Sequence, residues 1–209
     1  MKTLKYISVR LMAIAAIAVA FALPANAQIN PNTFYNIDWQ FNAPMKTHFS
    51  DRASGWGMNF EGGYYVAPNF GLGLFLNYHT NNEYIPRETF PVDETSTVTT
   101  DQQHTIFQLP FGATAKYRFS DGVCQPYIGV KLGANFTKFA SDFYILEVRD
   151  KTWGFYASPE IGMNIYPFAN NSFGFHVALY YTYSTNKGSV MHYDVDGMNN
   201  IGFRLGVAF

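Results

Sequence analysis

The sequence predicts an all-β fold, an eight-stranded antiparallel up-and-down transmembrane β-barrel. Eight segments alternate apolar and polar residues with a period of two, which places successive side chains on opposite faces of a strand. The connections between these segments alternate between short and long. Only 14% of the residues are charged while 18% are aromatic, and an ordinary soluble domain has about 25% charged residues.

The N-terminal residues 1–27 are predicted to be a cleaved signal peptide, which leaves residues 28–209 as the barrel domain. Three basic residues precede an uncharged apolar run at 11–23, and Ala25-Asn26-Ala27 supplies small side chains for cleavage. The alternative, an N-terminal membrane anchor, is disfavoured because the run is shorter than the ~20 residues of a spanning helix. No cysteine follows the run, which also disfavours a lipid-anchored lipoprotein.

Charge and cysteine content exclude two further classes. Without the first 27 residues the chain carries 11 basic and 15 acidic residues, a net charge of −4. A mildly acidic product has no basic stripe, so no nucleic-acid partner is expected. Cys124 is the single cysteine, so no intramolecular disulfide holds the fold together, and we expect Cys124 to lie in a turn.

The first three segments show the alternation most clearly. Residues 35–42 alternate strictly, and residues 56–66 place Trp, Met, Phe, Tyr and Val opposite a face rich in glycine. After a turn signal at 67–69, the Leu residues of segment 70–78 again lie opposite glycines. Helical spacing does not explain these runs, so each predicts a strand.

Five further segments repeat this pattern after a polar stretch. Each has Phe, Ile, Leu or Val on one face and a second face that contains Gly, together with Lys, Arg, Asn or Thr in most of them. The five segments are 107–119, 128–136, 153–165, 173–183 and 201–209.

The connections provide a second regularity. Short turns on one rim and long loops on the other are typical of an up-and-down barrel in an outer membrane, with the short turns in the periplasm. We therefore predict that the chain is located in the cell outer membrane, with its long loops at the cell surface. The short connections are 67–69, 120–125 and 169–172, and the predicted long loops are 42–53, 80–103, 140–151 and 184–199.

A soluble secreted barrel of the lipocalin kind, with its apolar face inward, is the alternative fold. About twenty aromatic side chains on the apolar face exceed what an eight-stranded interior holds. Glycine weakens a strand, and a solvated face would have no use for so many glycines, whereas a crowded interior needs their small size. The many glycines on the other face therefore indicate a crowded lumen and not a solvated surface. The 13 glycines of that face, out of 17, are 55, 57, 63, 71, 73, 112, 129, 133, 154, 162, 174, 202 and 206.

Aromatic residues are predicted to form two girdles that frame an aliphatic band at the bilayer. One girdle contains Tyr35, Tyr64, Phe70, Tyr117, Phe119, Phe173 and Phe209, and the other contains Phe41, Trp56, Tyr78, Phe107, Trp153, Phe155 and Tyr183.

Charged residues fall on the predicted lumen face at similar depth. Unpaired, each would cost several kcal/mol, so we predict a compensating network of salt bridges and hydrogen bonds that plugs the middle of the barrel. Such a network acts either as an ion gate or, as we favour, as a purely structural polar core. Its predicted members are Asp38, Glu61, Lys131 and Arg204 at similar depth, Glu160 slightly further in, and Lys116, which with Arg118 lies nearer the rim.

The last segment, Ile201-Gly202-Phe203-Arg204-Leu205-Gly206-Val207-Ala208-Phe209, carries a family resemblance. Together with the other strands, it resembles the small outer-membrane β-barrel superfamily of Gram-negative bacteria. This superfamily includes the membrane domain of outer-membrane protein A, the opacity-protein porins and their Bacteroidetes relatives. The resemblance implies that Phe209 is an assembly signal for the barrel-assembly machinery. It also implies contact with outer-membrane lipid and lipopolysaccharide.

Two prolines depart from this pattern. Pro110 and Pro159 lie inside predicted strands of a closed sheet, where a missing N–H removes a ladder bond. We expect bulges or local irregularity at both positions.

Three functions of different classes remain. The first is a membrane anchor or structural protein whose loops bind an extracellular ligand; loop 80–103 holds five acidic residues against Arg87, a net charge of −4. A solvated acidic loop is the commoner case, however. The second is a small porin-like channel for small or hydrophobic solutes. The third is a lipid-modifying enzyme with His48, Ser50 and Asp51 in the first long loop, which would need Ser and His within hydrogen-bond reach.

We favour the anchor and expect no enzyme. No catalytic, cofactor-binding or metal-binding residues are assigned, and no cofactor is expected. The five histidines are scattered and there is no cysteine pair for a metal. The sequence Gly71-Leu72-Gly73 has no following helix and therefore does not predict a phosphate site.

Overall fold

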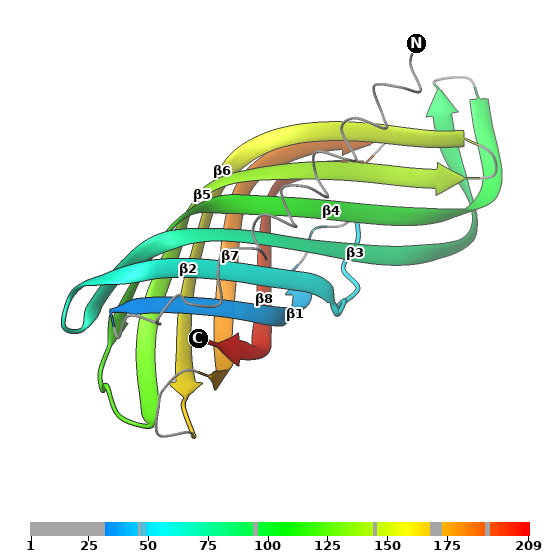
Figure 1. Ribbon diagram of the computed structural model, residues 1–209. Coiled ribbons are helices and arrows are strands. Elements are labelled where there is room, and N and C mark those ends of the chain that lie inside the picture. Colours follow the sequence, from blue (N-terminus) through cyan, green and yellow to red (C-terminus); the bar gives the residue numbers. More distant parts are fainter. Residues whose placement is uncertain are drawn as a thin grey trace, which may run out of the picture. The chain divides into compact units, whose positions relative to one another are not determined.

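The computed structural model describes residues 32–209, apart from 46, 48, 94–95, 144–145, 168–172 and 191–192. The predicted signal peptide, residues 1–27, lies outside the described residues. Each of eight strands pairs antiparallel with the next, and β8 pairs with β1 to close the barrel (Figure 1). The predicted eight-stranded up-and-down barrel is confirmed. The strands are β1 (Thr33–Pro44), β2 (Trp56–Ala67), β3 (Phe70–Asp93), β4 (Ser96–Arg118), β5 (Cys124–Phe143), β6 (Leu146–Ile165), β7 (Gly174–Val190) and β8 (Tyr193–Ala208).

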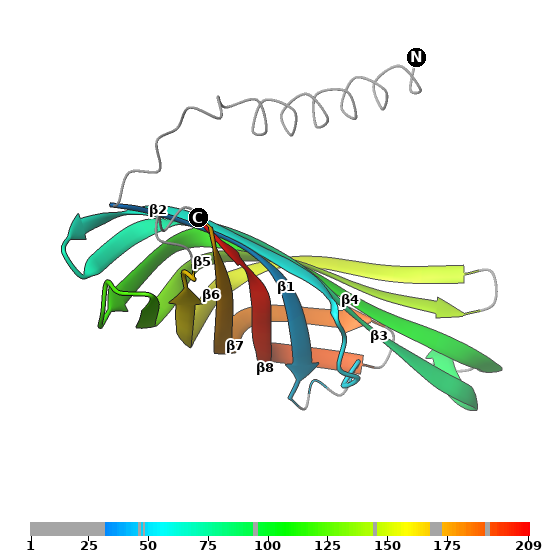
Figure 2. The same ribbon diagram turned by 60° about the horizontal axis from the view of Figure 1, so that its bottom comes forward.

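The strands continue far beyond the predicted ends. Segments 80–103, 140–151 and 184–199, predicted as loops, mostly form β-hairpins, so that prediction was wrong. Figure 2 shows β3–β4 and β5–β6 reaching beyond the ends of β1 and β2. Beyond the membrane both faces of a hairpin meet water, so the apolar alternation that marks a strand is lost although the backbone pairing continues. Cys124, expected in a turn, begins β5.

The outer face of the barrel is apolar and the lumen is polar. Outward-facing Trp56, Leu74 and Trp153 are 77%, 70% and 63% exposed, whereas Asp38 and Arg204 are fully buried. This orientation excludes the lipocalin alternative, in which apolar side chains would converge on the axis. All predicted girdle residues are exposed except Phe41, Phe107 and Phe209, which are half-buried. Among the described residues, no helix is long and apolar enough to cross a membrane.

The prolines inside the barrel interrupt hydrogen bonding without changing register. Pairing of β6 with β7 skips from Ala157↔Tyr183 to Glu160↔Tyr180 around Pro159, and the β3–β4 ladder has a similar gap at Pro110. The expected bulges are absent at these two positions, and the local irregularity is present. A strand that is paired on both sides cannot change register at one side alone. The β3–β4 pairing does shift beside Pro86 and Pro91, where β3 extends beyond the end of β2 and is not paired with it.

Glycines make room for close packing inside the lumen. Gly63 pairs with Gly73, and Gly112 pairs with Gly133, on neighbouring strands. A Cβ on Gly162 would lie 2.7 Å from the Tyr127 ring. An aromatic ring therefore packs directly on the backbone of a neighbouring strand at positions where that strand has glycine.

Candidate functional site

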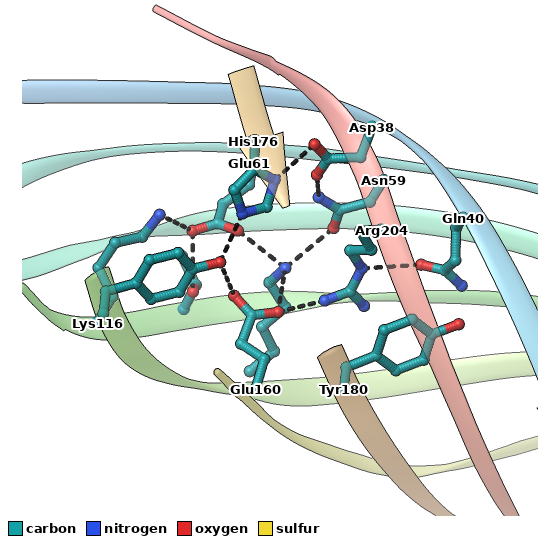
Figure 3. A network of polar contacts seen from close by, with 12 residues as sticks. Asp38, Gln40, Asn59, Glu61, Lys116, Glu160, His176, Tyr180 and Arg204 are labelled. Atoms are coloured by element: carbon teal, nitrogen blue, oxygen red, sulfur yellow. Dashed lines mark hydrogen bonds and ion pairs between the residues drawn. The ribbon is translucent and has the colours of Figure 1, made fainter. Parts of the chain in front are cut away.

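The middle of the lumen is filled by ion pairs between strands (Figure 3). Glu61 on β2 accepts from Lys116 Nζ at 2.6 Å and from Lys131 Nζ at 2.8 Å. Glu160 on β6 pairs with Lys131 at 3.0 Å and with Arg204 of β8. These side chains are buried, and a buried charge is costly unless it is paired. Each of these charges has a direct partner of opposite sign. Five of the six predicted members thus form one connected chain of ion pairs.

Asp38, the sixth predicted member, joins this chain through residues outside the predicted set. Its Oδ2 accepts from Asn59 Nδ2 at 2.6 Å, and its Oδ1 lies 2.6 Å from His176 Nδ1. The Tyr127 hydroxyl lies 2.7 Å from His176 Nε2 and donates to Glu160 Oε1 at 3.0 Å. The alternation does place Asn59, Tyr127 and His176 on the lumen face, but it does not say which partners they meet across the barrel.

Arg118 lies apart from the ion pairs. Its guanidinium lies 4.2 Å from the centre of the Tyr65 ring and donates to the Pro68 carbonyl at 2.8 Å. The network therefore joins three carboxylates to three strong bases and His176. Arg118 belongs instead to the short-turn rim.

Aromatic rings close the short-turn end of the lumen. Phe34 and Tyr65 are buried, with ring centres 5.3 Å apart. Lys116 Nζ lies 3.8 Å from the centre of the Phe34 ring, so this closure packs directly on the ion pairs. Such cation–π contacts stabilise a desolvated ammonium.

An apolar cluster closes the long-hairpin end. Phe49, from the irregular connection between β1 and β2, is only 2% exposed and packs with buried residues of four strands. Its ring stacks on the His104 imidazole at 4.3 Å, and its carbonyl oxygen lies 2.6 Å from His104 Nδ1. The strand residues of the cluster are Ile106, Phe139, Val190, Val195 and Met198, with Tyr193 packed against them.

Amides and hydroxyls line the lumen between the ion pairs and this cluster. Asn42 donates to Asn81 at 2.9 Å, and Asn200 donates to Thr182 at 3.0 Å. The Asn77 amide and the Thr137 hydroxyl are buried without a hydrogen bond to any described residue. Buried polar groups of this kind are usually satisfied by water, so this stretch of the lumen is suited to ordered water.

Ser50 and Asp51, the described residues of the lipid-modifying enzyme hypothesis, form no catalytic arrangement with each other. His48 lies outside the described residues. Asp51 Oδ1 accepts from Thr47 N at 2.6 Å and from Thr47 Oγ1 at 2.7 Å, so it closes a turn in the loop. Ser50 is buried, and its hydroxyl has no partner among the described residues. The described part of the chain also contains no cluster of three or more metal-ligating side chains.

Phe209 lies at the short-turn rim next to the first strand. Its N–H donates to the Tyr35 carbonyl at 2.8 Å, and the Tyr35 N–H donates back to Phe209 at 3.1 Å. Its ring packs edge-on against Phe173 with centres 5.7 Å apart. The end of the last strand is thus part of barrel closure.

Residues 13–209 match a family described as "Outer membrane protein beta-barrel domain". The chain belongs to this family. The barrel is therefore an outer-membrane protein, and by the general rule for such barrels the short turns face the periplasm and the long hairpins face outward. No curated protein sequence matches the chain.

The chain is similar to several solved structures at low identity, and the first of these shares its fold. Neisserial surface protein A is 12% identical, with 84% of this chain and 95% of that chain covered at a TM-score of 0.51. OprG of Pseudomonas aeruginosa is 15% identical, with coverages of 85% and 94% and a TM-score of 0.47. Ail of Yersinia pestis is 12% identical, with coverages of 85% and 99% and a TM-score of 0.45.

Proposed function

We propose that this outer-membrane barrel is a closed anchor that presents its long hairpins as recognition elements at the cell surface. The observation that supports this most is the three-layered closure of the lumen, by Phe34 and Tyr65, by the ion pairs of Glu61 and Glu160, and by Phe49. A channel needs a continuous hydrated path, and each of these layers opposes one. The porin-like alternative therefore has less support.

The hairpin β3–β4 is the longest element of the external side and carries clustered acidic groups. Glu88 and Asp101 are exposed, and the Tyr84 hydroxyl donates to Asp101 at 3.2 Å. The Asp101 carboxylate raises the pKa of Tyr84 above its ordinary value. This surface suits a polar or cationic extracellular ligand, because complementary charge speeds encounter and selects partners.

Two experiments test the anchor. In planar bilayers, the refolded protein is expected to show no conductance steps, and steady steps in the unmodified protein would contradict the proposal. In a Cys124→Ser background on intact cells, a membrane-impermeant maleimide is expected to label Thr99→Cys on the hairpin but not Asp121→Cys in a short turn. The reverse labelling would contradict surface display of the hairpins.

The last strand is proposed to carry the assembly signal, and the outer apolar band is proposed to contact lipid and lipopolysaccharide. For Phe209→Ala, we expect less insertion into the outer membrane of cells but normal refolding into detergent. Phe173→Ala removes the packing partner of Phe209 and serves as the control. An equal loss in both settings would mean that Phe209 acts through stability alone.

A further inference from the structure

The external mouth of the barrel contains an apolar pocket that the chain fills with its own Phe49. The walls are side chains of four paired strands: Ile106 from β4, Phe139 from β5, Val190 from β7 and Met198 from β8. The occupant comes from the connection between β1 and β2, whose described residues form no paired strand apart from the bridge of Ser54 with Asn42. The walls are therefore held in paired strands, whereas the occupant is held by a loop.

The pocket recognises the occupant through more than apolar contact. The Phe49 ring lies parallel to the His104 imidazole, with an interplanar angle of 5° at 4.3 Å. It meets Phe139 edge-on at 5.7 Å and Tyr193 edge-on at 5.9 Å. The carbonyl oxygen of the same residue lies 2.6 Å from His104 Nδ1. These contacts match an aromatic ring with an adjacent carbonyl acceptor, since aromatic pairs favour stacked and edge-on geometry.

The loop that carries the occupant is held by hydrogen bonds to the surrounding strands as well as within itself. Met45 N–H donates to the Asn199 carbonyl at 2.8 Å, Asn81 Nδ2 donates to the Arg52 carbonyl at 3.0 Å, and Trp39 Nε1 donates to the Gly55 carbonyl at 2.6 Å. The turn around Phe49 is closed by Asp51, which accepts from Thr47, and the Asp51 N–H donates to Glu83 at 2.7 Å. A backbone bridge joins Asn42 to Ser54 at the base of the loop. The walls are held by strand pairing, without interruption between β4 and β5 and with one irregularity between Ser184 and Lys187 in the β7–β8 hairpin. Lifting Phe49 would break its own contacts with His104 and the apolar cluster together with contacts of the loop, but the pairing of the wall strands does not involve Phe49.

We propose that this pocket is a binding site for a compact aromatic group with an adjacent carbonyl, arriving from outside the cell, and that Phe49 is its intramolecular competitor. The chemistry is that of an aromatic residue in an extracellular polypeptide or of a free aromatic carbonyl compound. The inference goes beyond display of the hairpins, because it concerns the mouth of the lumen and holds whether or not the hairpins bind a partner.

The test uses the full barrel in detergent micelles and follows the methyl signal of Met198 by NMR. Phe49→Ala vacates the pocket, and vacated apolar sites of this size accept aromatic guests. N-acetyl-phenylalanine amide is expected to shift the Met198 signal saturably in Phe49→Ala. Binding to the unmodified protein is expected to be about tenfold weaker, because the free ligand competes with Phe49. Acetophenone in a parallel titration distinguishes the two sources of ligand.

Further variants keep the result interpretable. Asp51→Ala loosens the loop with Phe49 still present, so its affinity should fall between those of the other two proteins; it also serves if Phe49→Ala does not fold. Phe34→Ala removes a buried ring at the opposite end and should show only the weak Met198 shift of the unmodified protein. N-acetyl-leucine amide should bind more weakly than the phenylalanine amide, and adding His104→Ala to Phe49→Ala should weaken binding. Absence of saturable binding of both aromatic probes in Phe49→Ala and Asp51→Ala would overturn the proposal, as would equal shifts in Phe34→Ala.

Discussion

Asp38 and His176 are 138 positions apart in the chain, yet Asp38 Oδ1 lies 2.6 Å from His176 Nδ1. Their strands, β1 and β7, are separated by β8 in the barrel order, so the contact crosses the lumen and does not follow a strand pair. The same is true of Lys116 and Glu61, on β4 and β2. Contacts of this kind connect strands that are not paired with each other and fill the interior with a polar core.

We predict that Glu61→Gln lowers the free energy of unfolding by about 3 to 5 kcal/mol, because two buried ammonium groups lose their shared carboxylate. Denaturant unfolding in detergent micelles, followed by the mobility of unboiled samples on gels, measures the change. Glu147→Gln is the matched control, because Glu147 pairs with Lys138 and Arg149 on an exposed hairpin. That variant should lose at most about 1 kcal/mol. Similar losses in the two variants would contradict a stabilising ionic core.

His176→Ala should destabilise the barrel by about 1 to 3 kcal/mol, because Asp38 and Tyr127 each lose a buried hydrogen-bond partner. His79→Ala is a useful comparison, since His79 is equally buried but the one hydrogen-bond contact of its side chain with the described residues is a 3.3 Å contact with Gln40. Chemical denaturation should show the larger loss for His176→Ala. If His79→Ala costs as much, the lost volume and not the hydrogen bonds explains the effect.

Gly133→Ala should impair folding, because a Cβ at this position would collide with the Phe111 carbonyl and the Gly112 Cα on the paired strand. Backbone atoms of a closed barrel cannot move aside as a side chain does. We expect a smaller folded fraction on unboiled gels after refolding. Gly122→Ala lies in a short turn, where the nearest atom to its Cβ is Ser120 Oγ at 3.6 Å, and it should refold normally. Normal refolding of Gly133→Ala would show that the strands separate locally.

Pro159→Ala supplies a backbone N–H at the gap between β6 and β7. An unsatisfied backbone group facing lipid is costly, so we expect equal or greater stability with the strand register unchanged. Hydrogen exchange should show that the new backbone amide of this variant is protected, with slower exchange at Tyr181 and Thr182. Pro110→Ala should behave likewise at the β3–β4 gap. Rapid exchange of the new amide would mean that the gap has a cause other than the missing donor.

The fold was predictable because it depends on local pattern. Alternation along segments such as 70–78 determines which side chains face lipid, and a period of two leaves no third choice of face. The same parity placed Asp38, Glu61 and Arg204 in the lumen before any pairing was known. Turn residues such as those at 67–69 further marked where each strand reverses.

The alternation of residues along a strand does not predict three features, which only the tertiary structure decided. The tilt and stagger of strands in a barrel set which lumen residues share a level, so the Asp38–His176 contact did not follow from the sequence. The hairpins at 80–103 and 140–151 lack a one-sided apolar pattern, because both of their faces meet water. The position of Phe49 depends on the path of a loop, and the pocket that receives it exists only after four distant strands have closed around it.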